Sequence, residues 1–433
     1  MKKTVKFRTF GCKLNQAETA GLTQAFIDAG YAVAAHDEPA DVSVLNTCTV
    51  TGRSSAKARQ AIRQLLREKP DTTLIVTGCY SQVAAEELAA IEGVDYIFGS
   101  QDKFSMLEHF PGPGKLASPE IIVTAMEEAA QAISSVGNFQ AQTRAFVKIQ
   151  DGCKNSCAYC IVPITRGPCR SVPEEEVLRQ VAALVAKGFK EIVLTGVHVG
   201  DYGKERRGRT ELTGLLRRLL TVDGLRRLRL SSLNCEDVTD ELLDLFAAEP
   251  RLCRHFHIPM QAGEDGVLTA MNRYYSTADF RNTIEHITRR LGDVGLGSDV
   301  IVGFPGETDA QFEKTIAFVK SIPFTYLHVF PYSIRPGTAA AEMTGHIAAT
   351  VKNDRARRLR LVAQEKKRQY SARFIGQTVD VLFEGRNQNG RISGLTSEYV
   401  RVSVPFDAAL DNRIVKVRVG ASVQDVLHGE VVG

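Results

Sequence analysis

Six of the nine cysteines in this chain of 433 residues fall into two groups of three, and this grouping restricts the fold and the chemistry more than any other feature. The loop trio has the spacing C-x3-C-x2-C: Cys153, Cys157 and Cys160. In the dispersed trio, each cysteine follows a short apolar run that ends in a turn: Cys12, Cys48 and Cys79. A cubane cluster has four irons, so three thiolates leave one iron open for another ligand. Each trio therefore predicts an open 4Fe–4S cluster, and two open clusters indicate two chemical steps.

The composition is that of an ordinary globular protein, with 44% apolar and 24% charged residues. There is no apolar run of about 18 residues and no long apolar stretch at the N-terminus, so we expect neither a transmembrane helix nor a secretory signal. Many cysteines without a signal favour a reducing compartment and metal binding over disulfides. We therefore expect a cytoplasmic protein without membrane contact.

Residues 1–110 alternate between strand and helix patterns, which predicts a doubly wound α/β domain over residues 1–114. The expected strands are Thr4–Phe10, Val42–Leu45, Thr73–Val76 and Val94–Phe98, and the expected helices are Glu18–Ala29, Ser54–Glu68 and Val83–Glu92. Ligands gather at the carboxyl ends of such strands, where the dispersed trio would meet. The alternative is that its cysteines are three small core hydrophobes. After the breaker at 111–114 we expect a linker with one helix, Glu120–Ser134.

A second α/β pattern fills residues 144–330, within a predicted domain of residues 139–369. Six strands are expected: Ala145–Ile149, Glu191–Leu194, Leu228–Ser231, His255–Ile258, Ser298–Val302 and Tyr326–Phe330. The helix expected over residues 174–187 begins after Pro173, has three glutamates in its first turn and ends at Gly188. Six βα units are too few for a full eight-stranded barrel, so we expect an open (β/α)6 barrel. The loop trio follows its first strand, on the face where barrel enzymes carry their chemistry.

Residues 370–433 predict a third domain, a small all-β barrel of the oligonucleotide-binding kind. Its expected strands are Thr378–Phe383, Gly390–Leu395, Tyr399–Val404, Arg413–Val419 and Val426–Val432. Two other segments are basic: residues 351–370 carry eight Lys or Arg against two acids, and residues 204–229 carry nine against three. Such stripes are typical of proteins that bind a phosphate-rich partner, although a solvated helix face gives the same pattern.

The loop trio could also be part of a zinc site, but no fourth Cys or His lies at a matching spacing. Instead, a C-x3-C-x2-C loop that opens a partial barrel resembles the radical S-adenosylmethionine (radical SAM) superfamily. This resemblance implies that the three cysteines hold a 4Fe–4S cluster whose open iron binds the amino and carboxylate groups of SAM. Reductive cleavage then gives methionine and a 5′-deoxyadenosyl radical, while the protein supplies position and electrostatics.

Further motifs resemble the methylthiotransferases and occur in the order of that family over nearly the whole chain. They begin at Thr9-Phe10-Gly11-Cys12, Asn46-Thr47-Cys48, Thr77-Gly78-Cys79, His257-Ile258-Pro259-Met260-Gln261, Val302-Gly303-Phe304-Pro305-Gly306-Glu307 and Pro331-Tyr332-Ser333-Ile334-Arg335. The C-terminal barrel resembles the RNA-binding TRAM domain of the family. The resemblance implies two 4Fe–4S clusters and two SAM molecules per turnover: one methylates a sulfur held at the dispersed trio, and the other removes hydrogen from the substrate carbon. It also implies tRNA as partner and a reductase, flavodoxin or ferredoxin as electron donor.

The sequence Cys12-Lys13-Leu14-Asn15 resembles the branch that adds a methylthio group to carbon 2 of N6-threonylcarbamoyladenosine beside the tRNA anticodon. From the family we assign a SAM pocket to Gly196, Ser232, Gln261 and Gly303 and substrate contacts to Arg273 and Arg335. The usual Gly-Gly-Glu-like SAM motif is replaced by Thr195-Gly196-Val197-His198, where His198 is either a ligand or an ordinary barrel residue. Cys169, Cys235 and Cys253 lack partner spacing and are interpreted as packing residues.

Three other functions are compatible with parts of this pattern. The same chemistry acts on isopentenyladenosine in tRNA or on an aspartate of a ribosomal protein in neighbouring branches of the family. A non-catalytic iron–sulfur protein that binds RNA would need four protein ligands for each cluster, but only three are found at each trio.

Overall fold

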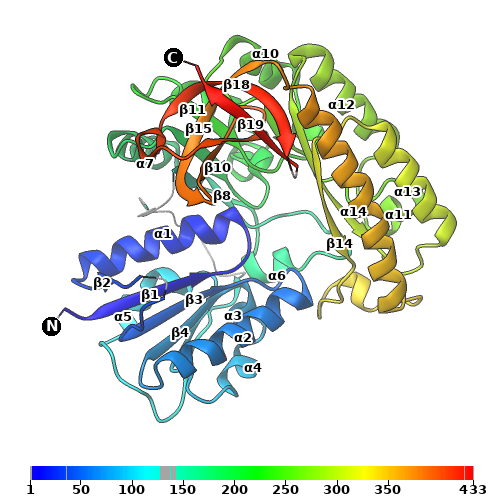
Figure 1. Cartoon of the computed structure of the whole chain (residues 1–433). Coiled ribbons are helices and arrows are strands. Elements are labelled where there is room, and N and C mark those ends of the chain that lie inside the picture. The colour runs from blue at the N-terminus through cyan, green and yellow to red at the C-terminus, as the bar shows by residue number, and fades with distance from the viewer. Residues whose placement is uncertain (1, 36, 127–136, 138–142, 424, 433) are drawn as a thin grey trace.

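The computed structural model describes residues 2–35, 37–126, 137, 143–423 and 425–432. Its strands form a parallel sheet near the N-terminus, an open barrel in the middle of the chain and a closed barrel near the C-terminus (Figure 1). This is the mixed α/β architecture that the sequence predicts. Among the described residues, no helix is both long and apolar enough to cross a membrane.

The N-terminal sheet has the order β2-β1-β3-β4-β5-β6, and all its strands are parallel. The strands are β1 (Thr4–Thr9), β2 (Ala32–Val33), β3 (Val42–Thr47), β4 (Thr73–Gly78), β5 (Tyr96–Phe98) and β6 (Glu120–Ile122). The helices are α1 (Lys13–Asp28), α2 (Gly52–Glu68), α3 (Cys79–Val83), α4 (Ala85–Ala89) and α5 (Met106–His109). Every residue of β3 and β4 is buried, as expected for parallel strands covered on both faces. The doubly wound prediction is confirmed.

Three local predictions in this region are wrong. Helix α1 begins at Lys13, five residues before the expected start, because the chain turns directly from β1 at Cys12. The expected helix Val83–Glu92 is broken at Ala84, whose φ of −145° and ψ of 39° are not helical. Residues Glu120–Ile122 form β6 instead of a helix, because pairing with β5 overrides their local preference; the rest of that expected helix lies largely outside the described residues.

The middle of the chain forms a six-stranded parallel barrel that is open on one side (Figure 1). Its strands are β7 (Arg144–Lys148), β10 (Glu191–Thr195), β11 (Arg227–Leu230), β12 (His255–His257), β13 (Gly295–Val302) and β14 (Tyr326–Pro331). Two isolated bridges connect β11 and the residues after it to β12 and the residues before it, Leu228 with Leu252 and Ser232 with His257. Within the described strands, no pairing joins β7 to β14. The expected open barrel is confirmed.

Helices cover the outside of this barrel, and α14 lies along β14 (Figure 1). The helices of this part of the chain are α6 (Val162–Arg166), which contacts α3, and α7 (Glu174–Ala186), α8 (Lys204–Arg207), α9 (Leu212–Leu219), α10 (Asp240–Ala248), α11 (Asp265–Ala270), α12 (Thr277–Leu291), α13 (Asp309–Ser321) and α14 (Ala349–Ala372). A short hairpin, β8 (Gln150–Asp151) with β9 (Arg170–Ser171), flanks the cysteine loop. Helix α7 confirms its sequence signals, with Pro173 at the N-cap and Glu174 to Glu176 in the first turn.

The C-terminal strands form a closed barrel in the order β15-β16-β17-β19-β18. They are β15 (Thr378–Gln388), β16 (Arg391–Leu395), β17 (Arg401–Pro405), β18 (Ile414–Val423) and β19 (Val426–Val431). The turn between β16 and β17 closes the amino end of the central barrel. Arg229 donates hydrogen bonds from β11 to the backbone oxygens of Ser397 (2.8 Å) and Thr396 (3.1 Å), and it pairs with Glu191 at 2.7 Å. The small barrel is therefore anchored at the end opposite to the cysteine loop.

Candidate functional site

The dispersed trio lies at the carboxyl edge of the N-terminal sheet. Cys12 follows β1, Cys48 follows β3, and Cys79 is the first residue of α3 after β4. Since β1, β3 and β4 are adjacent strands, the topology brings the three thiols to one edge. Burial, together with the nearby Cys79 and Cys12, raises the pKa of Cys48 to about 12. The thiols are thus close enough to influence one another electrostatically.

Close backbone packing holds these cysteines together. Gly11 precedes Cys12 with a φ of +109°, and a Cβ there would lie 2.8 Å from the Cβ and 3.2 Å from the Sγ of Cys48. The amide of Asn15 donates to the backbone oxygens of Phe10 (2.8 Å) and Thr47 (2.9 Å), which joins the loops after β1 and β3. Glycine is required at position 11 because of both its backbone conformation and this contact.

The loop trio follows β8 at the carboxyl rim of the barrel, and two N–H donors point at its sulfurs. The backbone N–H of Asn155 donates to Cys153 Sγ (3.4 Å), and Arg273 donates from Nη1 to Cys157 Sγ (3.3 Å). Arg273 is fixed by Asn234, which accepts from Nη2 at 3.1 Å. Burial raises the pKa of Cys160 to about 12. A bound metal cluster would stabilise the thiolate form of Cys160 against this effect of burial.

The spacing of each trio suits a multinuclear cluster better than a single ion. Three thiolates on one tetrahedral zinc lie about 3.8 Å apart, given Zn–S bonds of about 2.3 Å. In the described part of the chain, the Cys, His, Asp and Glu groups whose ligand atoms all lie within 4.8 Å of one another include neither trio. Three sulfurs spread more widely than this fit an iron–sulfur cubane. Two further possible ligands lie beside the loop trio, because the ligand atoms of Cys153, His198 and Asp201 are within 4.8 Å of one another.

The four residues assigned to a SAM pocket lie beyond the carboxyl ends of four different barrel strands. Gly196 follows β10, Ser232 follows β11, Gln261 comes after β12 and pairs with β13, and Gly303 follows β13. They share the rim that carries the loop trio. Gly303 has a φ of +73°, and a Cβ there would lie 2.3 Å from Cγ of Lys352, so this glycine also allows α14 to pack closely.

His198 belongs to a buried charged group that the sequence did not reveal. Its Nδ1 lies 2.9 Å from Asp201, its Nε2 contacts Asp237, and Lys204 pairs with Asp201 at 2.7 Å. Burial alone would lower the pKa of His198, but its two carboxylate partners and the nearby Cys153 raise it to about 12. The imidazolium is therefore held at the loop trio. Asp237 lies on another βα loop, which is why no local motif linked it to His198.

One segment after β14 touches the loops of both trios. The hydroxyl of Ser333 accepts from the backbone N–H of Gly52 (2.9 Å), and Arg335 donates to the backbone oxygen of Thr49 (3.2 Å), one residue after Cys48. Seven residues after Ser333, the backbone N–H of Ala340 donates to Ala158 O (2.7 Å) inside the cysteine loop. Residues 333–340 therefore connect the two trios.

Arg335 and Arg273, both expected to contact substrate, have different surroundings. Arg335 donates only to neutral oxygens, and in the described ranges no carboxylate forms an ion pair with it. Arg273 is committed to Cys157 and Asn234, and its guanidinium lies 4.8 Å from the centre of the Tyr275 ring. Of these two arginines, Arg335 is the one whose guanidinium is not committed to a cysteine of the loop trio.

A buried charge network lies between the two trios. Arg166, from α6, donates to Asp151 (3.0 Å) beside the cysteine loop and to Glu18 (2.9 Å) of α1. Glu18 also pairs with Lys103 (2.6 Å) and Lys148 (3.4 Å). All five side chains are at most 7% exposed. The network joins the N-terminal sheet to the barrel and was not predicted, because Glu18 and Arg166 are far apart in the sequence.

Many cations of the two basic segments form ion pairs with acidic residues of the same chain. In α14, Arg355 pairs with Glu307 and Asp309, both at 2.7 Å, and Arg358 pairs with Glu313 at 2.6 Å. In residues 204–229, the paired cations are Lys204, Arg206, Arg207, Arg217, Arg218, Arg227 and Arg229. Acids from elsewhere in the chain supply most of the partners, so counting charge within a segment overstated the basic surface.

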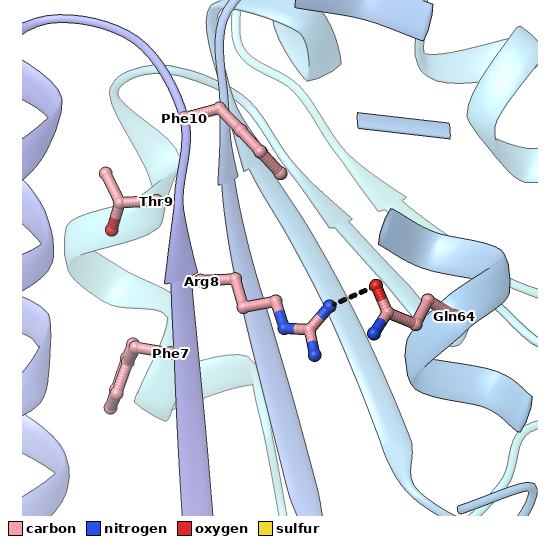
Figure 2. Close-up of a pocket in the computed structure, with 5 residues that line it drawn as sticks. All are labelled: Phe7, Arg8, Thr9, Phe10 and Gln64. Atoms are coloured by element: carbon pink, nitrogen blue, oxygen red, sulfur yellow. Dashed lines mark hydrogen bonds between the residues drawn. The ribbon is translucent and has the colours of Figure 1, made fainter. Parts of the chain in front are cut away.

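The remaining cysteines are buried, as packing residues would be: Cys169 is 4%, Cys235 7% and Cys253 1% exposed. A separate hollow lies beside β1 and is lined by Phe7, Arg8, Thr9, Phe10 and Gln64. Figure 2 shows Arg8 reaching across to Gln64 of α2, to which it donates a hydrogen bond of 3.0 Å. None of the assigned site residues lines this hollow.

Three segments of the chain match known families. Residues 4–99 match the family described as uncharacterized protein family UPF0004, residues 147–319 match the radical SAM superfamily, and residues 372–432 match the TRAM domain. Among solved structures, the radical S-adenosylmethionine methyltransferase TsrM from Kitasatospora setae is similar with a TM-score of 0.55 and 17% identity, covering 79% of this chain and 77% of that one. At 17% identity, the similarity to TsrM concerns the fold alone. With the three-cysteine loop on an open barrel, these matches define a radical SAM protein.

Curated relatives are similar over nearly their full length. A threonylcarbamoyladenosine tRNA methylthiotransferase, MtaB, from Bacillus subtilis is 38% identical, covering 96% of this chain and 93% of the relative. The MtaB of Aquifex aeolicus is 35% identical over 92% and 96% of the two chains. A tRNA-2-methylthio-N(6)-dimethylallyladenosine synthase from Moorella thermoacetica is 33% identical over 100% and 99%. The chain belongs to the radical SAM methylthiotransferase family, in the branch of the MtaB proteins. An iron–sulfur cluster and SAM are therefore its cofactors.

Proposed function

We propose that this protein adds a methylthio group to carbon 2 of N6-threonylcarbamoyladenosine beside the anticodon of tRNA. The observation that carries the proposal is the pair of cysteine trios joined by residues 333–340, since one carbon must be reached both by the group that removes its hydrogen and by the group that supplies sulfur. The branch is supported by the Cys12-Lys13-Leu14-Asn15 motif and by the 38% identity to an MtaB protein.

We assign the loop trio to the cluster that binds SAM and the dispersed trio to a second 4Fe–4S cluster. When bound, these groups supply an organic radical at the loop trio and a sulfur carrier at the dispersed trio. The protein holds the cluster thiolates with N–H donors and close packing. We propose Gly196, Ser232, Gln261 and Gly303 as the walls of the SAM pocket. A reductase, flavodoxin or ferredoxin of the cytoplasm would supply electrons.

The structure also supports a division of the substrate roles. We propose that Arg335 pairs with the carboxylate of the threonylcarbamoyl group, because its charge has no acidic partner among the described residues. A carboxylate enclosed in a binding site needs such a partner, since burying an unpaired charge is costly. Arg273 acts at the loop trio instead, through its N–H donation to Cys157. The domains proposed for these roles are residues 1–114, 139–369 and 370–433, although β6 already extends the first sheet to Ile122.

Competition between two tRNAs tests the function, one carrying threonylcarbamoyladenosine and the other isopentenyladenosine. The reconstituted protein should methylthiolate the first and neglect the second. Arg335→Gln should reduce this preference, whereas Arg53→Gln, an exposed neighbour on α2, should leave it intact. Preference of the unmodified protein for isopentenyladenosine would assign the chain to the neighbouring branch.

A further inference from the structure

The interior face of the open barrel carries an unusual row of polar and aromatic side chains on β12, β13 and β14. Side chains alternate along a strand, and one set faces the helices: Phe256, Leu296, Val300 and Val329 are all buried in the main hydrophobic core. The opposite set therefore faces the barrel interior: His257, Asp299, His328 and Phe330. The strand register places Asp299 beside His328 and Ile301 beside Phe330.

Asp299 organises this face as an anchored anion between two histidines. Its carboxylate lies 3.1 Å from His257 Nε2 and 3.0 Å from His328 Nδ1. Although burial would raise the pKa of Asp299, the two imidazoles lower it overall, so the carboxylate stays ionised. Tyr326, at the start of β14, packs against this row, with its ring centre 5.3 Å from that of His328. The side chains are held in place before any ligand arrives.

The upper part of the row is open to solvent. The side chain of His328 is 56% exposed, and Phe330 is 37% exposed, while its neighbours on the other face of β14 pack into the core. The ring centres of His328 and Phe330 are 6.3 Å apart and their planes meet at 68°, so the imidazole borders the phenyl ring edge to face. An accessible phenyl ring beside an imidazole, in the interior of a barrel, is suited to stacking against a flat heterocycle.

This row ends next to both cysteine trios. Phe330 is three residues before Ser333, so their Cα atoms are at most about 10 Å apart along an extended chain. Ser333 contacts the loop of Cys48, and the same segment reaches the loop trio at Ala340. A base stacked on Phe330 would thus lie next to the segment of residues 333–340, which contacts the loops of both trios.

We propose that Phe330 forms a stacking platform for the purine of the target nucleotide, flipped out of the anticodon loop into the barrel, with His328 at the edge of the platform and held there by Asp299 and His257. The inference rests on the proposed function and names the surface that receives its substrate base. An enzyme that modifies a ring carbon must expose that carbon, and removing the base from its stack costs free energy that a new aromatic partner offsets.

The test uses the full-length, cluster-loaded protein and an anticodon stem-loop that carries 2-aminopurine at the target position. This base fluoresces when unstacked and reports flipping without any reaction at carbon 2. Binding of the unmodified protein should change the fluorescence, and Phe330→Ala should weaken stem-loop binding about tenfold, the order expected for loss of one stacking contact. Phe330→Tyr should restore it. Leu116→Ala, a residue of similar exposure on the N-terminal domain, should have no effect.

Three results would overturn the platform. Stem-loop binding unchanged by Phe330→Ala would exclude stacking at this ring. A loss of SAM affinity with unchanged stem-loop binding would show that the purine on Phe330 is the adenine of SAM. A stoichiometric metal ion beyond the cluster irons, lost in His328→Ala, would make the His257, Asp299 and His328 group a metal site, since their ligand atoms lie within 4.8 Å of one another. Normal flipping without any methylthio product would instead contradict the proposed function alone.

Discussion

Replacing Glu18 by glutamine tests the view that the buried charge network fixes the two trios relative to each other. Glu18 is fully buried and contacts Arg166, Lys103 and Lys148. In the wild type, three cations face two carboxylates, Glu18 and Asp151. Glu18→Gln preserves the shape of the side chain but leaves three buried cations with one carboxylate. Removing one partner of a buried pair costs about 3–5 kcal/mol, so we expect a loss of unfolding free energy in that range.

The matched control is Glu313→Gln, which breaks the exposed pair of Glu313 with Arg358, whose side chains are 54% and 40% exposed. That change should cost less than about 1 kcal/mol. Urea unfolding, followed by far-UV circular dichroism without oxygen, compares the two variants. Equal stability of Glu18→Gln and Glu313→Gln would refute the claim that the network holds the domains together.

The pH dependence gives the same test a second readout. The pKa of Glu18 in the folded protein is well below its ordinary value of 4.5, because the attraction of Arg166, Lys103 and Lys148 outweighs the effect of burial. Its contribution to stability is therefore complete above the ordinary value and is lost as the pH falls through the folded pKa. The wild type should lose this component on acidification, whereas Glu18→Gln should lack it at every pH. Identical acid unfolding of the two proteins would contradict the assignment.

Other predictions concern the cysteine sites and the RNA. Gly11→Ala should displace Cys48 and abolish the cluster of the dispersed trio, so that the iron content falls from about eight to about four atoms per chain. The control is Gly30→Ala, which has a φ of +90° and no heavy atom within 4 Å of the added Cβ, and which should retain the full iron content. Replacing Cys153, Cys157 and Cys160 by alanine should also leave about four irons per chain. A full iron content in this variant or in Gly11→Ala would show that the cluster ligands are wrongly assigned. Arg273→Leu should shift the loop-trio cluster to a more negative potential in an EPR-monitored titration, because a hydrogen bond to Cys157 is lost; an unchanged potential would remove this role. Binding of tRNA should weaken steeply with salt, since bound phosphates release counterions, and a flat response would exclude a phosphate-dominated interface.

The sequence predicted the features that depend on local pattern. The dispersed trio was found because apolar runs marked the ends of β1, β3 and β4, and parallel strands bring their carboxyl ends to one edge. The same reasoning gave the six barrel strands and the five strands of the C-terminal barrel. Periodicity and turn signals act over a few residues, so they can be read without knowing the tertiary structure.

The features that the sequence concealed all depend on distant partners. Arg166 meets Glu18 across 148 positions, and Asp237 meets His198 across 39, so no spacing links them. The charge count over residues 351–370 treated Arg355 as an unpaired cation, but this residue of α14 is paired with Glu307, which lies outside that segment. Residues Glu120–Ile122 read as a helix because their partner strand, β5, was not part of the local signal.

The activity in the cell can be measured by liquid chromatography and mass spectrometry of tRNA nucleosides from a strain in which the gene has been deleted. In this strain, threonylcarbamoyladenosine should accumulate without its 2-methylthio derivative. The wild-type gene should restore that derivative, and a gene with alanine at Cys12, Cys48 and Cys79 should not. Unchanged 2-methylthio-threonylcarbamoyladenosine in the deletion strain, or its restoration by the cysteine variant, would contradict the account.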